Sequence, residues 1–307
     1  MRLAVLSAPR RLDVVEQPVP EPAAGEVLLR VAGCGVCASE LDMWEGRSAV
    51  DYPRFPGHEV SGVVERGADG FEPGDPVAAW VTERGFADYV AVRAEHCFPA
   101  GDVPLDLALA EPLACAVNAV ELAAPALGDD VAIVGAGFMG NLVQKLVQLT
   151  GPRAVVVADT RADALERART LGATRTVDVR AESLAGLDAD VTFEVTGAEA
   201  GLLAAGDATR MSGKLAIVGY HQGEPRAIPL GHWNWMAFQI LNAHFRDVDT
   251  IMRGMRTGMR LLTSGRLRLD DLVTHRFPLA QVNRAFAVAA EKPAGFVKAT
   301  VSTTMED

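Results

Sequence analysis

Residues 131–140 read Val-Ala-Ile-Val-Gly-Ala-Gly-Phe-Met-Gly, an apolar strand-like run that leads directly into a Gly-x-Gly-x-x-Gly pattern. The first glycine of this pattern permits a tight turn, the second lets a pyrophosphate approach the backbone, and the third lets a helix pack on the strand. The phosphate then meets the positive end of that helix. The stretch therefore predicts a dinucleotide site. Its predicted contacts are Gly135, Gly137, Phe138, Met139 and Gly140.

A second apolar run, AVVVAD, ends at Asp159, nineteen residues after Gly140. An acid at this spacing is placed to bind the ribose hydroxyls of the coenzyme and to repel a 2'-phosphate. The sequence therefore favours NAD(H). Arg161 lies close enough to soften that preference, or is a solvated residue at a helix start, so the use of NADP(H) is left open.

The pattern of apolar runs and turn residues along the chain changes near Pro104. Before it, short alternating runs are separated by Gly and Pro, which is typical of a β-barrel-like unit. After it, strand-like and helical runs alternate, which indicates βαβ units on a doubly wound parallel sheet. The last strand-like run, FVKATV, alternates like the first part. We expect an α/β protein in which residues 113–246 form a Rossmann domain and residues 1–112 and 247–307 form a mostly β domain.

Composition excludes several classes of protein. The 307 residues carry a formal net charge of −11, which argues against a nucleic-acid partner because such a partner needs a basic face. No run reaches the roughly 20 apolar residues of a membrane span. The N-terminal residues lack the pattern of a signal peptide, so we expect a cytoplasmic protein without disulfides between its four cysteines.

Three separate motifs in the β-rich parts each offer one metal ligand. Cys37 lies in GVCASE, His58 in FPGHE and Glu111 in EPLAC. A Cys, a His and a carboxylate match the S, N and O donors of catalytic zinc, which keeps a fourth position open. Taken alone, Cys37 would more often be an inert core thiol and His58 a buried histidine with satisfied hydrogen bonds.

Taken together, these motifs resemble the zinc-type medium-chain dehydrogenase/reductase family with its GroES-like catalytic domain. GHEVSGVV, PGD, GFADY, GAGFMG, THRFPLAQVNRAF and FVKATV look like its further landmarks, over nearly the whole chain. The resemblance implies that Cys37, His58 and Glu111 hold a catalytic zinc ion. It also implies that Glu59 either ligates zinc or exchanges with its water. EPLAC is similar to the polyol and threonine dehydrogenase branch.

The resemblance assigns further roles. Ser39 matches the hydroxyl that relays the substrate proton outward, and Asp42 stands at the next relay position, where relatives often carry histidine. Lys298 resembles a contact to the coenzyme phosphate. Gly219 is the next-to-last residue of the strand-like run KLAIVGY, whose carboxyl end should border the nicotinamide. His221 follows it and either contacts the coenzyme or substrate or is a packing residue.

One segment departs from the family. Between Val77 and Gly85, where relatives commonly insert a lobe with four cysteines for a structural zinc, this chain has only AAWVTER. We therefore expect one catalytic zinc ion per chain and no structural zinc.

The sequence predicts a zinc-dependent oxidoreductase that transfers a hydride between NAD(H) and an alcohol, with a secondary alcohol or polyol favoured by the branch resemblance. Zinc would bind the substrate oxygen and Ser39 would pass the proton outward. The alternatives are a reductase of an activated alkene or imine, an NAD-using epimerase, or a non-catalytic nucleotide-binding relative. We expect a homodimer, paired through the strand near residues 238–243, or a homotetramer.

Overall fold

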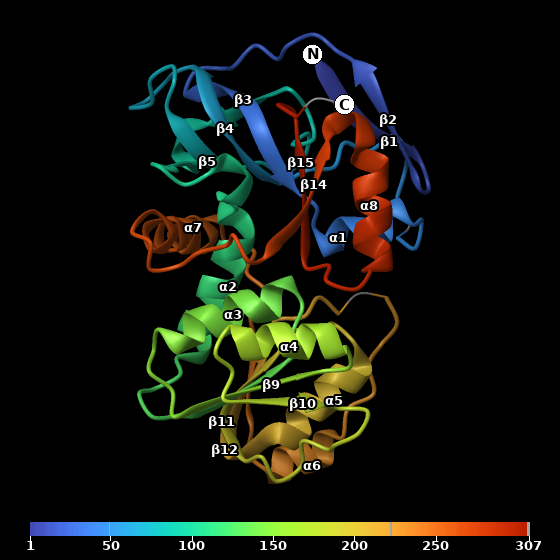
Figure 1. The fold of residues 1–307 in the computed structure, drawn as a ribbon, viewed down its shortest axis with the longest axis vertical. Coiled ribbons are helices and arrows are strands. Elements are labelled where there is room, and N and C mark those ends of the chain that lie inside the picture. The colour runs from blue at the N-terminus through green and yellow to red at the C-terminus, as the bar shows by residue number, and fades with distance from the viewer. Residues whose placement is uncertain (49, 222, 306–307) are drawn as a thin grey trace. The chain divides into compact units, whose positions relative to one another are not determined.

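The computed structural model describes residues 1–48, 50–221 and 223–305 and divides into two compact units (Figure 1). The first contains Met1–Ala114 and Met255–Asp307, and the second contains Cys115–Gly254. The divisions fall inside two helices, α2 (Ala110–Ala123) and α7 (Val248–Thr263). They lie two and eight residues after the predicted boundaries, which were placed from the sequence pattern and not from contacts between residues.

The first unit is built mainly from strands. Seven strands form one sheet in the order β14-β15-β3-β4-β5-β7, with β6 paired to β3, and β1 and β2 form a separate antiparallel pair. The strands are β1 (Arg2–Ala8), β2 (Arg11–Glu16), β3 (Glu26–Gly35), β4 (Glu59–Arg66), β5 (Pro76–Trp80), β6 (Tyr89–Arg93), β7 (Cys97–Pro99), β14 (Val273–Pro278) and β15 (Lys298–Ser302). The C-terminal β15 lies antiparallel to β3, so the end of the chain belongs to this mostly β unit.

Short helices pack on these strands. They are α1 (Ala38–Trp44) and α8 (Val282–Glu291), with the 3-10 turns η1 (Ala94–His96), η2 (Leu105–Leu107) and η3 (Leu279–Gln281). Trp44 at the end of α1 is buried, with its ring centroid 6.1 Å from that of Phe286 in α8. Its indole N–H donates to Asn283 at 3.1 Å. This anchor fixes α1, the helix that begins directly after Cys37.

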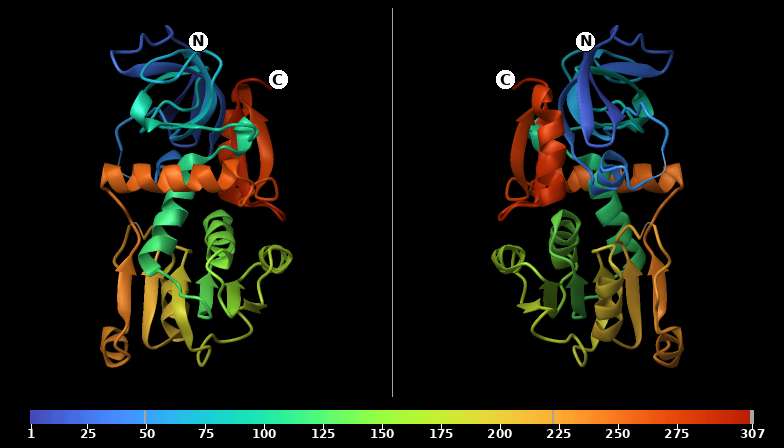
Figure 2. Two further views of the ribbon diagram at one scale, coloured as in Figure 1. Left: turned by 90° about the vertical axis from the view of Figure 1, so that its left-hand side faces the viewer. Right: turned by 90° about the vertical axis from the view of Figure 1, so that its right-hand side faces the viewer.

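The second unit is a six-stranded parallel sheet in the order β10-β9-β8-β11-β12-β13, and Figure 2 shows its strands side by side. The strands are β8 (Asp130–Val134), β9 (Ala154–Asp159), β10 (Arg175–Asp178), β11 (Ala189–Glu194), β12 (Thr209–Ile217) and β13 (Gln239–Asn242). The helices are α3 (Phe138–Gln148), α4 (Ala162–Thr170), α5 (Glu199–Ala208) and α6 (Leu230–Trp235). This order reverses between β8 and β11, so the doubly wound fold is confirmed.

The apolar runs of these strands form the buried core of the second unit, with Ala132, Val156 and Leu215 among its members. Because the strands are parallel, their carboxyl ends meet at one edge of the sheet. Val134 of β8 pairs with Ala158 of β9 and with Glu194 of β11. The glycine pattern, Asp159 and Glu194 therefore leave the sheet at the same edge.

Within the three described ranges, no helix combines the length and the apolar character that a bilayer crossing requires.

Candidate functional site

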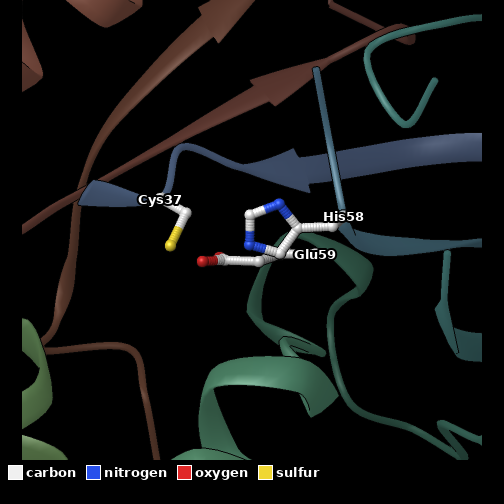
Figure 3. A group of neighbouring side chains, drawn as sticks. All are labelled: Cys37, His58 and Glu59. Atoms are coloured by element: carbon white, nitrogen blue, oxygen red, sulfur yellow. The ribbon is translucent and has the colours of Figure 1, made fainter. Parts of the chain in front are cut away.

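Cys37, His58 and Glu59 converge on one point in the first unit (Figure 3). One ligand atom of each lies within 4.8 Å of the others. The register of the sheet explains this convergence, because Gly35 at the end of β3 pairs directly with Glu59 at the start of β4. Cys37 follows two residues after Gly35 and precedes α1, and His58 precedes Glu59. Backbone pairing thus brings Cys37 close to His58, which lies 21 positions later in the chain.

Glu40 orients His58 and was missed by the sequence analysis. Its Oε1 lies 3.0 Å from Nδ1 of His58 and accepts the Gly57 N–H at 2.6 Å. Burial opposes a charge on His58, but Glu40 and then Cys37 outweigh it and raise the His58 pKa well above its ordinary value. The available signal was spacing, because Glu40 lies three residues after Cys37, about one helical turn away.

Glu59 is buried and paired with a lysine from the far end of the chain. Nζ of Lys298 donates to Oε1 of Glu59 at 2.7 Å, and the two side chains are 6% and 1% exposed. Gly35 lies between them, where a Cβ would stand 1.9 Å from Oε2 of Glu59. Lys298 therefore contacts one of the candidate metal ligands. Its predicted contact with the coenzyme phosphate stays a prediction.

Burial would lower the Lys298 pKa, but the charges of Glu59, Cys37 and Glu111 together raise it above its ordinary value. Glu111, in the first turn of α2, is thus close enough to act on Lys298 electrostatically. Among the described residues, the group whose ligand atoms all lie within 4.8 Å contains Cys37, His58 and Glu59 and does not include Glu111. Its assignment as a ligand stays a prediction.

Both predicted relay residues lie on α1, the helix that begins directly after Cys37. The exposed Ser39 donates from Oγ to Sγ of Cys37 at 3.2 Å. Asp42, on the same helix, accepts a hydrogen bond from Nε of Arg47 at 3.0 Å. The Asp42 carboxylate is therefore engaged in an ion pair, and its part in a relay stays a prediction.

The residues present fit a zinc ion. They offer one sulfur, one imidazole nitrogen and carboxylate oxygens, which are the donors that zinc prefers. Within the described chain, Oε2 of Glu59 is buried without a hydrogen-bond partner. A buried carboxylate oxygen in this state carries a desolvation cost that a cation would offset.

The second unit presents a surface suited to a dinucleotide. Gly137 caps the start of α3, and a Cβ built there would meet nothing within 4 Å, so the backbone is open to a phosphate. Phe138 and Met139 form the half-buried first turn of α3. Gly140 packs so closely that an added Cβ would lie 1.8 Å from the carbonyl oxygen of Gly135.

Asp159 ends β9 beside this surface. Its Oδ2 accepts the Ala136 N–H at 2.7 Å, and its Oδ1 accepts the N–H groups of Thr160 and Arg161. The Arg161 guanidinium is paired with Asp163. Gly219 is buried after β12 and donates its N–H to the carbonyl oxygen of Glu194 at 2.9 Å.

The two units match different family models. Residues 23–102 match the alcohol dehydrogenase GroES-like domain, and residues 139–256 match the zinc-binding dehydrogenase domain. The chain is 32% identical to sorbitol dehydrogenase of Gallus gallus, over 90% of this chain and 89% of the relative. It is 28% identical to L-threonine 3-dehydrogenase of Pyrococcus abyssi, over 86% and 88%.

Solved structures share the fold. The crystal structure of 2R,3R-butanediol dehydrogenase from Bacillus subtilis superposes with a TM-score of 0.86 at 22% identity, covering 99% of each chain. These structures show the shared fold, and the sequence relatives show the family. The family resemblance inferred from the motifs is therefore confirmed. The chain belongs to the zinc-type medium-chain dehydrogenase/reductase family, as a member with an alcohol dehydrogenase GroES-like domain and a zinc-binding dehydrogenase domain.

Proposed function

We propose that this oxidoreductase is a zinc-dependent alcohol dehydrogenase that interconverts a secondary alcohol or polyol and its carbonyl product with NAD(H). The convergence of Cys37, His58 and Glu59 within 4.8 Å carries this proposal. By their names, its sequence relatives include dehydrogenases of sorbitol, which is a polyol, and of L-threonine at carbon 3, which carries a secondary hydroxyl; both support that substrate class.

The chain's own residues divide the work between binding and proton movement. Cys37 and His58 would hold zinc, with Glu59 or Glu111 as the carboxylate. Bound zinc would supply Lewis-acid polarisation of the substrate oxygen. The exposed hydroxyl of Ser39, 3.2 Å from the Cys37 sulfur, is placed to carry the substrate proton to solvent. Asp159 and the glycine turn that contains Gly137 would hold NAD(H) on the second unit, and the nicotinamide would supply the group that exchanges hydride.

NAD(H) is the proposed coenzyme in preference to NADP(H). A 2'-phosphate at the end of β9 would meet the Asp159 carboxylate, and the nearby Arg161 is already paired with Asp163. We propose one zinc ion per chain, because the segment between Val77 and Gly85 contains no cysteine for a structural site.

We also propose self-association through β13, the edge strand of the parallel sheet. Its residues Gln239 and Ile240 are exposed, and an unpaired edge is a template for pairing with a second copy. Sedimentation measurements test this: a concentration-independent monomer would contradict it.

The decisive experiment is elemental analysis of zinc in the gently purified protein and in Cys37→Ser. The expected result is one zinc ion per chain in the parent, none in the variant, and NADH accumulation with a secondary alcohol in the parent alone. Cys97→Ala is the matched control, because Cys97 is a buried thiol of the same unit outside the cluster and should leave the zinc content unchanged. A parent protein that stays free of zinc after repletion would overturn the proposal.

An alcohol that is converted without net accumulation of NADH would indicate an epimerase instead.

A further inference from the structure

Glu194, the last residue of β11, is a buried carboxylate whose role the proposed chemistry does not explain. Its side chain is completely inaccessible to solvent. Its Oε1 accepts the N–H of Thr196 at 2.7 Å, the hydroxyl of Thr196 at 2.5 Å and the N–H of Gly197 at 2.9 Å. A buried charge is costly unless it is paired and hydrogen-bonded, so this group organises the loop that follows β11.

The same residue also holds the loop that follows β12. Its Oε2 lies 2.8 Å from Nε2 of His221, and its backbone carbonyl accepts the N–H groups of Val218 and Gly219. The two loops touch, because a Cβ added at Gly219 would lie 2.2 Å from the nitrogen of Gly197. Glu194 therefore joins two loops that are neighbours only because β11 and β12 are adjacent in the sheet.

The contacts made by Glu194 connect further, to the strand next to β12. Tyr220, between two residues bonded to Glu194, stacks on His244 with ring centroids 5.0 Å apart and an interplanar angle of 29°. His244 follows β13, and its N–H donates to Asn242 at 3.3 Å. The carboxyl ends of β11, β12 and β13 are thus connected through Glu194, His221, Tyr220 and His244.

These strands form the half of the Rossmann sheet that lies opposite Asp159. Each half of such a sheet binds one mononucleotide, and the acid after the second strand of the first half contacts the adenosine ribose. The half containing β11, β12 and β13 would therefore receive the nicotinamide mononucleotide of a bound coenzyme. A loop displaced at this edge would misplace the ring that exchanges hydride, and small misplacements are costly to catalysis.

We infer that the Glu194–His221 pair is a positioning device for the nicotinamide half of the coenzyme, acting through the segment Val218–His221. This inference rests on the proposed function, because it assigns a role within its coenzyme site. His221 is the last residue of this segment and anchors it to Glu194. Its Nε2 is bound to Glu194, and its Nδ1 is shielded from solvent.

The test compares two substitutions of His221. His221→Gln can still donate a hydrogen bond to Glu194 from an amide, whereas His221→Leu fills similar space and cannot. Binding of NADH and of ADP-ribose, which lacks nicotinamide, is measured by titration calorimetry on the zinc-loaded protein. Steady-state KM for NAD and kcat are measured alongside.

For His221→Leu we expect NADH binding to weaken roughly tenfold, as for the loss of one hydrogen bond to a charged group, with ADP-ribose binding unchanged. His221→Gln should restore most of the NADH affinity. The KM for NAD should rise in His221→Leu in parallel with the dissociation constant for NADH.

Two results would overturn the inference while the proposed function stands: equal NADH affinity in His221→Leu and the parent, or parallel loss of both ligands, which would indicate a general structural defect. A parent protein that binds neither ligand would instead overturn the proposed coenzyme, and the inference with it.

Discussion

Oε1 of Glu40 lies 3.0 Å from Nδ1 of His58 while it also accepts the Gly57 N–H, so one buried carboxylate fixes both the imidazole and the backbone that carries it. The other ring nitrogen, Nε2, is then left for the metal. A carboxylate behind a ligating histidine sets its tautomer and increases its basicity. Because the charges of Glu40 and Cys37 raise the His58 pKa, a metal ion at Nε2 must also compete with a proton for that nitrogen.

Glu40→Gln should therefore weaken zinc binding by about 10- to 100-fold, because a neutral amide orients the imidazole less strongly than a carboxylate does. Competition against a chelator of known affinity measures the change. Glu65→Gln is the control, since Glu65 on β4 forms an exposed ion pair with Arg30 outside the cluster. Equal zinc affinity in Glu40→Gln and the parent would show that Glu40 only stabilises the Gly57 backbone.

Removal of the Lys298 ammonium should destabilise the first unit. Lys298→Met leaves the buried Glu59 carboxylate without its partner, which typically costs about 3–5 kcal/mol. The double variant Lys298→Met/Glu59→Gln should recover most of this loss, since neither charge is then buried. Urea unfolding of the metal-free proteins measures both values, and a Lys298→Met variant as stable as the parent would contradict the role of the pair.

The same pair predicts a pH dependence. The folded-state pKa of Lys298 is raised above its ordinary value of 10.5, so the folded protein holds this proton more tightly than the unfolded chain. Its contribution to stability is fully present below pH 10.5 and is lost as the pH rises through the raised pKa. Lys298→Met should flatten the unfolding free energy above pH 10.5 relative to the parent. If the free energy of unfolding falls equally above pH 10.5 in the parent and in Lys298→Met, the loss of stability comes from titratable groups other than Lys298.

Local patterns in the sequence were sufficient to predict the fold and to single out Cys37 and His58, which the structure brings together, because each lies beside a glycine that shapes its backbone. The role of Asp159 at the coenzyme stays a prediction. The pairing of Lys298 with Glu59 was not predictable in this way, since 239 residues separate them and only the alignment of β15, β3 and β4 brings them together. The contact of Glu194 with His221 was missed for the same reason, because His221 follows the next strand of the sheet.

The four cysteines should differ in their reactivity toward a thiol reagent at pH 8. Burial raises the pKa of Cys97 to about 12, and burial followed by the charge of Glu40 raises that of Cys34 well above its ordinary value, so neither forms the reactive thiolate. The exposed Cys115 should be modified rapidly. Cys37 should be modified only after zinc is removed by a chelator.

Mass spectrometry of peptides identifies the modified sites, and Cys115→Ser provides a background on which Cys37 is observed alone. Rapid modification of Cys37 in the zinc-loaded protein would indicate that its sulfur is not a metal ligand.

Asp159→Asn should reduce the preference for NAD over NADP. The substitution keeps an oxygen that can accept the Ala136 N–H but removes the charge that binds the ribose hydroxyls and repels a 2'-phosphate. A hydrogen bond to a charged group contributes about 1.5–3 kcal/mol, so the ratio of kcat/KM for the two coenzymes should fall by roughly tenfold or more.

Asp178→Asn is the matched control for this change. Asp178 ends the neighbouring strand β10, and its carboxylate is paired with Arg180, which lowers its pKa to about 2. The coenzyme ratio should be unchanged in this variant. Adding Asp163→Asn to Asp159→Asn should shift the ratio further toward NADP, because it releases the Arg161 guanidinium from its present partner. A ratio that responds to Asp163→Asn alone as strongly as to Asp159→Asn would show that Arg161, rather than the acid at the end of β9, decides the choice of coenzyme.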